Sequence, residues 1–330
     1  MLIMAKEKTK SLVTIDVGGT NARFALAEVA DGKVVSVNEP TTFATGSVDG
    51  LAAAWQRFAD AHPEGLPRAA AIAVAGPVNA NEIRFTNSHW VIRPADIGSE
   101  LGVDAHCLIN DFEAVGHAVA AAGEEHFLHL SGPEEIPEFG TTTITGPGTG
   151  LGVAALVRRP DGSYRVQPTE GGHIGFAPED RVEEKILAVV RESLPRVSVE
   201  RMCSGPAILY LAEAIARIEG LPMPSGDDRE LWLSAITGTD PVAVKAMERF
   251  CMILGAAAGD LALAHGSNAV VIAGGLGLRL RDQIRASGFA ERFVYKGRFK
   301  SLMETIPVRL ITHPQPGLFG AAAAFAQAHS

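Results

Sequence analysis

A glycine-rich turn near the N-terminus gathers the groups that bind a phosphate. Gly18-Gly19-Thr20-Asn21 follows a β-prone run that ends at Asp16, and Arg23 lies just beyond the turn. Paired glycines let backbone N–H groups approach an anion closely, while Thr20, Asn21 and Arg23 add side-chain donors and positive charge. Asp16 is suited to hold Mg²⁺, directly or through a water molecule. An ordinary hairpin with an Asx-type turn stays open as the alternative.

A second turn of the same kind lies near the middle of the chain. Gly148, Thr149 and Gly150 follow the β-branched run at residues 141–145 and precede another apolar run. The Gly-Thr pairs of the two turns lie 129 residues apart (148 − 19). One strand–turn–strand unit used twice predicts a duplicated phosphate-binding core. Neither copy is a P-loop, because no Lys-Ser/Thr follows the glycines. Neither is a dinucleotide fingerprint, because a strand follows the turn where a helix should.

An Asn-Asp pair stands where another apolar run ends. Residues 105–109 predict a strand, Asn110 and Asp111 follow it, and an Ala-rich helix is expected over residues 113–122. An Asp at the carboxyl end of a strand, just before a helix, lies on the ligand-binding edge of an open α/β sheet. The alternative is that Asp111 only caps the helix.

Further segments carry groups that could meet a small ligand. A Gly-Gly turn holds Glu170 and His173 three residues apart, which could aim a carboxylate and an imidazole at one ligand, although a structural histidine also fits. The loop around Asn87 is polar, with a solvated turn as its alternative. Gly274 and Gly275 end an apolar strand, where bare backbone would let an adenine ring and its ribose lie close. A plain strand-to-helix turn competes with that interpretation, and Glu200 gives no signal by spacing alone.

The elements that must position these residues alternate between strands and helices. The sequence predicts strands at residues 12–16, 24–27, 33–37, 69–75, 105–109, 141–145, 268–273 and 307–312, and helices at 47–62, 113–122, 179–192, 206–219, 241–265 and 317–328. Residues 124–140 are expected to be an irregular connector because they contain Gly132, Pro133 and Pro137. No Pro/Gly/Ser linker separates independent domains, so the repeat predicts two α/β halves with the site in the cleft between them.

The length and composition are those of an ordinary globular protein. The 330 residues suffice for about two domains, and they are 47% hydrophobic and 20% charged. A net charge of −9 argues against a nucleic-acid surface. Three scattered cysteines without a CxxC pair exclude a cysteine-based zinc cluster and favour a reducing compartment. The apolar N-terminal start is too short for a signal peptide, and the longest hydrophobic stretch falls short of a membrane span, so we expect a cytoplasmic protein.

Six ordered blocks resemble the bacterial ATP-dependent glucokinases, which belong to the actin-like ATPase superfamily. The blocks are DVGGTNAR (16–23), IND (109–111), GTGLG (148–152), EGGH (170–173), ERMCSGP (200–206) and IAGG (272–275). TNSHW (86–90), KGRFK (296–300) and PGLFG (316–320) extend the likeness over nearly the whole chain. Any one block would be a weak signal, but six in order are highly specific.

The resemblance implies two actin-like (ribonuclease H-like) α/β domains around a cleft: a small one of residues 1–120 with 312–330, and a large one of residues 121–311. It implies transfer of phosphate from ATP, with Mg²⁺, to the 6-hydroxyl of glucose, with Asp111 as the catalytic base. By residue match, the ligands of glucose are Asn87, Asn110, Asp111, Glu170, His173 and Glu200. Asp16 and Gly18 to Arg23 match the first phosphate motif, Gly148 to Gly150 the second, and Gly274-Gly275 the adenosine motif.

Three function classes remain open beside this resemblance. Glucose phosphorylation is preferred, a kinase of another hexose or an amino sugar comes second, and a sugar-sensing regulator on the same fold comes third. A regulator would need a DNA-binding segment, and we find neither a helix-turn-helix before Leu12 nor a basic patch. The related ROK kinases carry a cysteine-rich zinc motif after a sugar-binding histidine, whereas no cysteine follows His173 closely. Family members often form homodimers, so a dimer is expected by resemblance only.

Overall fold

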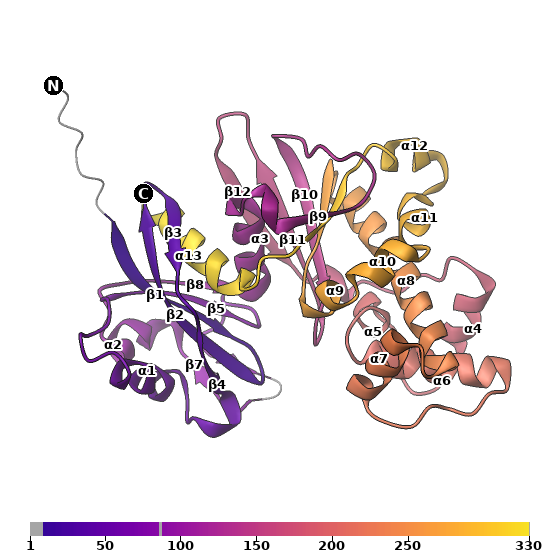
Figure 1. Ribbon diagram of the computed structural model, residues 1–330, viewed down its shortest axis with the longest axis horizontal. Helices are drawn as coiled ribbons and strands as arrows, with labels where there is room; N and C mark the ends of the chain where they lie inside the picture. The colour runs from indigo at the N-terminus through magenta and orange to yellow at the C-terminus, as the bar shows by residue number, and fades with distance from the viewer. Residues whose placement is uncertain (1–8, 86–87, 330) are drawn as a thin grey trace. The chain divides into compact units, whose positions relative to one another are not determined.

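The computed structural model describes residues 9–85 and 88–329, and its chain divides into two compact units. Unit 1 combines Met1–Gly123 with His313–Ser330, and unit 2 is Glu124–Thr312. Each unit contains one mixed β-sheet with helices packed on it (Figure 1). The α/β fold with two sheet-based domains, predicted from the duplicated turn, is thereby confirmed.

The sheet of unit 1 has the strand order β3-β2-β1-β5-β8, with β4 pairing on β2. Its strands are β1 (Lys10–Val17), β2 (Asn21–Ala30), β3 (Lys33–Val37), β4 (Thr41–Ala44), β5 (Ala69–Val74) and β8 (Ala105–Asn110), and a separate ribbon joins β6 (Ile83–Arg84) to β7 (Val91–Ile92). Its helices are α1 (Leu51–Asp60), α2 (Ile97–Leu101), α3 (Asp111–Ala121) and α13 (Pro316–Ala328). β1 runs antiparallel to β2 but parallel to β5, which is in turn parallel to β8.

Alternating residues of β1 build the two layers of unit 1. Val13 and Ile15 face a core that includes Phe58 of α1, while Leu12 faces a second core that includes Phe325 of α13. This period of two is what a strand buried on both faces requires. The sheet is therefore covered on both sides, and its carboxyl edge is left for the site.

The sheet of unit 2 has the order β12-β11-β10-β13-β14-β9. Its strands are β9 (Phe127–Ser131), β10 (Gly140–Pro147), β11 (Leu151–Arg158), β12 (Tyr164–Thr169), β13 (Ala269–Ile272) and β14 (Val308–Ile311). Its helices are α4 (Arg181–Val190), α5 (Val199–Met202), α6 (Ala207–Glu219), α7 (Asp228–Thr237), α8 (Pro241–His265), α9 (Gly275–Arg279), α10 (Arg281–Ala286), α11 (Phe289–Val294) and α12 (Lys300–Met303). Three antiparallel strands followed by two parallel ones repeat the pattern of unit 1, as the duplicated turn predicted.

Helix α8 is the central helix of unit 2 and has the predicted bounds. Asp240 caps its start by accepting hydrogen bonds from the N–H groups of Val242 and Ala243, and Gly266 ends it at a φ of 62°. Small residues along the helix are buried, and they let α6, α7 and α11 pack closely against it.

Two expectations about elements were wrong, and one helix was missed. Residues 124–140 are not an irregular connector, because β9 lies within them and pairs antiparallel with β14. The helix expected over residues 113–122 begins earlier, at Asp111. Helix α7 was not expected, although its capping box, formed by Asp227 and Glu230, can be read from the sequence.

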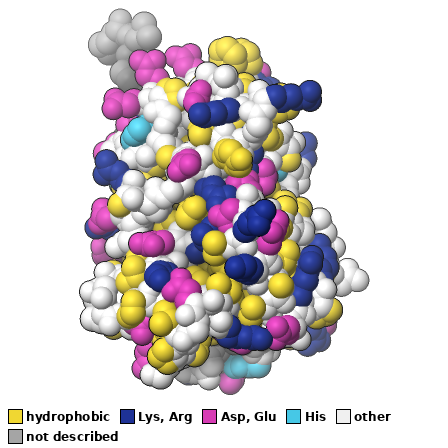
Figure 2. Space-filling model, turned by 90° about the vertical axis from the view of Figure 1, so that its right-hand side faces the viewer, with side chains coloured by type: hydrophobic (Ala, Val, Ile, Leu, Met, Phe, Trp, Pro, Cys, Tyr) yellow, Lys and Arg dark blue, Asp and Glu magenta, His cyan; other side chains and the backbone are white. Residues whose placement is uncertain are grey.

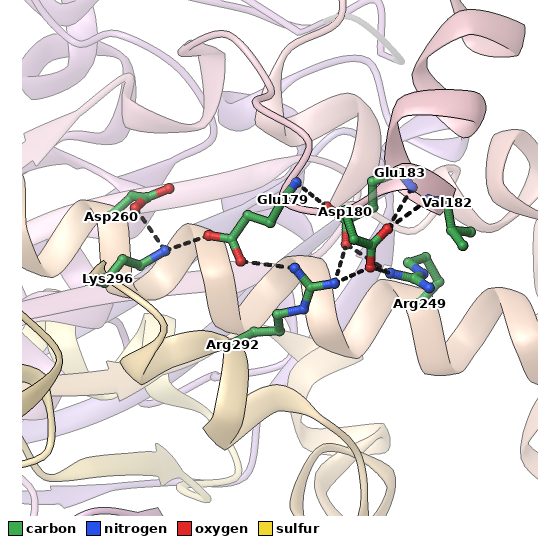
Figure 3. A network of polar contacts seen from close by, with 8 residues as sticks. All are labelled: Glu179, Asp180, Val182, Glu183, Arg249, Asp260, Arg292 and Lys296. Carbon is green, nitrogen blue, oxygen red and sulfur yellow. Dashed lines mark hydrogen bonds and ion pairs between the residues drawn. The ribbon is translucent and has the colours of Figure 1, made fainter. Parts of the chain in front are cut away.

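A buried ion network fixes the segment before α4 to the helices of unit 2 (Figure 3). Arg292 of α11 contacts Glu179 at 3.0 Å and Glu183 at 3.3 Å, and it also pairs with Asp180. The Nζ atom of Lys296 lies 2.9 Å from Glu179 and 2.8 Å from Asp260 of α8. The side chain of Glu183 is only 2% exposed, so its charge depends on these partners.

The surface shows no concentration of one charge on the face seen in Figure 2. Lys and Arg side chains are interspersed there with Asp and Glu. Among residues 9–85 and 88–329, no helix is both long enough and apolar enough to cross a membrane.

Candidate active site

The turn between β1 and β2 has the chemistry that the sequence predicted for a phosphate site. The N–H of Gly18 donates to the carbonyl of Asn21 at 2.9 Å, which closes the turn. Arg23, on β2, pairs with the carboxylate of Asp16 at 3.3 Å across the hairpin. Thr45 holds the turn from outside: its N–H donates to Thr20 O and its Oγ1 donates to Gly19 O, at 3.0 and 2.9 Å.

The strand register brings Asp16 and Asp111 to one edge of the sheet. Val17 of β1 pairs with Val74 of β5, which pairs with Asn110 of β8. Asn110 is the N-cap of α3: its Oδ1 accepts from the N–H groups of Phe112 and Glu113 at 2.8 and 3.2 Å. Asp111 Oδ1 also accepts the N–H of Phe112, at 2.9 Å, so both side chains contact the first turn of α3 although Asn110 is the N-cap residue.

Burial sets the proton affinity of the two carboxyl groups. Together with the negative charge of Asp16 it raises the pKa of Asp111 to about 6, against weaker opposing hydrogen bonds from the backbone and from Asn110. Burial also raises the pKa of Asp16, while the charge of Arg23 lowers it. Asp111 therefore has the proton affinity of a base that works near neutral pH.

The donor set around Asp16 fits a magnesium ion that is held largely by phosphate and water. In the described parts of the chain, no group of three or more His, Cys, Asp or Glu could hold a metal. Mg²⁺ commonly takes one or two carboxylates together with substrate phosphates and waters, so a single aspartate suffices. A Cβ at Gly317 would lie 2.8 Å from Asp16 Oδ2, so this glycine keeps space open beside the carboxylate.

Backbone hydrogen bonds close the turn between β10 and β11. The N–H of Gly148 donates to Gly150 O at 2.8 Å, and Gly205 donates its own N–H to Gly148 O at 2.7 Å. Gly274 packs against this turn with a φ of 81°, and a Cβ there would lie 2.5 Å from Pro147 O. A Cβ at Gly275 would meet nothing within 4 Å, so the backbone there is open to a ligand.

Unit 2 also brings the predicted sugar ligands together. His173 Nε2 lies 3.7 Å from Glu170 Oε2, and His173 Nδ1 lies 3.9 Å from Glu200 Oε1. The imidazole is 57% exposed, so it is not a buried structural histidine. Glu200 Oε2 accepts the N–H of Leu151 at 3.0 Å, and a Cβ at Gly150 would lie 2.5 Å from that oxygen. Gly150 is thus needed for the glutamate to approach the phosphate turn.

The predicted site residues fall into two sets. Unit 1 carries Asp16, Gly18, Gly19, Thr20, Asn21, Arg23, Asn110 and Asp111, and unit 2 carries Gly148, Thr149, Gly150, Glu170, His173, Glu200, Gly274 and Gly275. Asn87 lies outside the described residues. Sequence reasoning missed Thr45 and Gly205, which bind the carbonyl groups of the two turns, and Gly317, which leaves space beside Asp16. The ERMCSGP and PGLFG blocks contain the two glycines and were the available signal.

Comparisons with known proteins show which family the chain belongs to. A profile of the Glucokinase family matches residues 13–328. The chain is 54% identical to a glucokinase of Zymomonas mobilis over 320 residues, which cover 97% of this chain and 98% of that protein. The chain belongs to the glucokinase family. It is an enzyme, and its activity is the ATP-dependent phosphorylation of glucose.

Solved structures show the same fold. A crystal structure of glucokinase from an Antarctic psychrotroph is 33% identical with a TM-score of 0.84, covering 96% of this chain and 98% of that one. A ROK family glucokinase from Streptomyces griseus, in complex with glucose and AMPPNP, has a TM-score of 0.60 at 20% identity and covers 95% and 98% of the two chains. At that identity the second likeness shows the fold alone.

Proposed function

We propose that Asp111 is the general base in the transfer of the γ-phosphate of ATP to the 6-hydroxyl of glucose. The observation that carries this is a partly buried carboxyl directly after β8, at the same edge of the sheet as Asp16, and burial raises the pKa of this group to about 6. At pH 7 such a group is mostly ionised, yet it binds a proton far more readily than an ordinary aspartate. Asn110 fixes its position by capping α3 and by donating from Nδ2 to Gly76 O at 3.1 Å.

The reaction balances with this one proton acceptor. The glucose O6 attacks the γ-phosphorus, the bond from phosphorus to the bridging oxygen of ADP breaks, and the O6 proton passes to Asp111. The products are glucose 6-phosphate and ADP, and Asp111 later releases its proton to solvent. Positioning and charge neutralisation supply most of the catalysis in such a transfer.

Glu170, His173 and Glu200, together with Asn110 and Asn87, are the proposed ligands of the sugar hydroxyls. Two carboxylates that each lie within 4 Å of one imidazole offer several acceptors to a polyol. Such a set discriminates strongly against a sugar with a missing or inverted hydroxyl, because a polar group of the site then loses its hydrogen-bond partner. Glucose is therefore preferred over other hexoses and amino sugars.

The two glycine-rich turns are the proposed phosphate sites, with Gly274 and Gly275 against the adenosine. Asp16 would hold Mg²⁺, directly or through water, and the bound ion would neutralise phosphate charge. Arg23 would add a positive charge beside the first turn. A homodimer and a cytoplasmic location remain predictions from the family resemblance and the scattered cysteines.

The decisive experiment compares Asp111→Asn with the exposed control Asp104→Asn in a coupled ADP-release assay over a panel of hexoses. Asp111→Asn should lower kcat by at least about 100-fold while glucose affinity stays within about threefold. Asp104 pairs with Arg68 on the surface of the same unit, so its variant should behave as wild type. A kcat for Asp111→Asn within a factor of a few of wild type would remove this residue from the base role.

A further inference from the structure

The phosphate turn of unit 2 is held by hydrogen bonds that begin at a buried tryptophan. Trp232, on α7, is 2% exposed, and its Nε1 donates to Gly205 O at 2.8 Å. Gly205 in turn donates its N–H to Gly148 O at 2.7 Å. The indole N–H thus fixes Gly205, and Gly205 in turn fixes the Gly148 carbonyl of the turn.

Unit 1 contains the same arrangement, built from unrelated segments. Trp90 is 1% exposed, and its Nε1 donates to Thr45 O at 3.0 Å and to Val48 O at 2.7 Å. Thr45 then donates its N–H to Thr20 O and its Oγ1 to Gly19 O. In both units, therefore, a buried indole N–H fixes an anchor residue, and that anchor binds carbonyl groups of the turn.

A hydrogen bond to a backbone carbonyl also fixes the direction of the N–H in the same peptide group. The two groups of a trans peptide point in opposite directions, so binding Gly148 O turns the N–H of Thr149 away from the anchor. Binding Gly19 O does the same for the N–H of Thr20. Thr20 and Thr149 are both exposed, and within residues 9–85 and 88–329 neither N–H has a protein acceptor. Both amides are thus free for an anion.

We propose that Trp90 and Trp232 are positioning residues that orient these two turns toward the phosphates of ATP. The inference rests on the proposed role of the turns. N–H donors that already point toward the phosphates lose less conformational freedom when ATP binds. Through this preorganisation the indole hydrogen bonds would increase the affinity for ATP.

Packing alone is the competing explanation, because both indoles also fill hydrophobic cores. Trp232, for instance, packs edge-on against Phe250 at a centroid distance of 4.9 Å. The chain supplies a matched control in Trp55, which is 8% exposed within the core of unit 1. In the described part of the chain no acceptor is recorded for its indole N–H. A Trp→Phe change there removes packing without disturbing a turn.

The test compares Trp90→Phe and Trp232→Phe with Trp55→Phe by the KM values for ATP and glucose, by competitive inhibition with AMP, and by the thermal midpoint. We expect the first two variants to raise the KM for ATP about 2- to 10-fold, the range for one net hydrogen bond. The KM for glucose and the inhibition by AMP, which lacks the outer phosphates, should stay unchanged. Trp55→Phe should leave all three constants unchanged. Equal shifts in all three variants, or a parallel loss of AMP binding, would overturn the proposal.

A second pair of variants decides the matter if the tryptophan variants fail to fold. Thr45→Val removes the hydroxyl that binds Gly19 O, and Thr14→Val removes a comparable buried hydroxyl that donates to Leu318 O at 2.7 Å. Only Thr45→Val should weaken ATP binding, and equal effects would overturn the proposal.

Gly148→Val separates this outcome from a failure of the proposed function. If Gly148→Val weakens ATP binding while the tryptophan and Thr45 variants do not, the turns bind phosphate without needing their anchor residues. If it too leaves ATP binding unchanged, the assignment of the turn itself fails.

Discussion

The two units use one strand pattern for different chemistry. In unit 1 the turn carries the Asp16–Arg23 ion pair, and β8 ends at the carboxyl group of Asp111. In unit 2 the corresponding turn has no charged side chain of its own and is enclosed by Gly205 and Gly274. One copy therefore carries charged side chains, among them the proposed proton acceptor, while the turn of the other copy offers mainly backbone groups.

The connections between equivalent strands differ as well. Between β12 and β13, unit 2 inserts five helices, α4 to α8, and the chain around them carries Glu170, His173 and Glu200. An ion network joins this insertion to the chain after β13, because Glu179, Asp180 and Glu183 lie in the insertion whereas Arg292 and Lys296 follow β13 (Figure 3). The proposed sugar ligands of unit 2 thus come from a helical region larger than its counterpart in unit 1, and the ion network stabilises that region.

The largest expected effect is on the stability of the inserted region. Arg292→Met should destabilise the protein by about 3 kcal/mol, because it leaves Glu179, Asp180 and the buried Glu183 with fewer positive partners. Thermal or urea unfolding measures this. Arg68→Met, which breaks an exposed pair in unit 1, is the control and should leave the midpoint nearly unchanged. Similar unfolding midpoints for the two variants would mean that the ion network contributes little to the stability of the protein.

Next in size is the effect of blocking the uncharged turn. A Cβ at Gly148 meets no protein atom within 4 Å, so Gly148→Val should fold normally. Its side chain would nevertheless stand where a phosphate must approach the backbone, so ATP affinity should fall by at least about tenfold, and less for Gly148→Ala. Calorimetry with ATP and with glucose separates the two substrates. Unchanged ATP affinity in a folded Gly148→Val protein would make the second turn only a structural repeat of the first.

A smaller difference is expected between the two glutamates of unit 2. Glu200 is 24% exposed and accepts a backbone N–H, whereas Glu170 is 75% exposed. Glu200→Gln should therefore raise the KM for glucose about tenfold and Glu170→Gln about threefold, since a better-buried acceptor loses more when its charge is removed. The KM for ATP should stay nearly constant in both. If either substitution changed the KM for ATP and left the KM for glucose unchanged, that glutamate would need another role.

The sequence predicted most of what regular patterns encode. Helix α8 kept its predicted bounds because Asp240, Pro241 and Gly266 mark its ends. The two turns were recognisable because glycine and threonine recur in the same order. What could not be predicted was contact between distant segments: Gly205 binding Gly148, Thr45 binding Gly19, and β9 pairing with β14. Such backbone contacts depend on tertiary packing and leave little mark on residue type.

The most direct test of the central claim is the pH dependence of kcat/KM for glucose at saturating ATP and Mg²⁺. Asp111 accepts a proton only when ionised, and burial together with the charge of Asp16 raises its pKa to about 6 in the free protein. A Mg²⁺ ion at Asp16 would offset the charge of that carboxylate, so activity should rise about tenfold per pH unit at low pH and level off at or below about pH 6. The residual activity of Asp111→Asn should lack this limb. A wild-type profile that also lacks this limb would contradict Asp111 as the base.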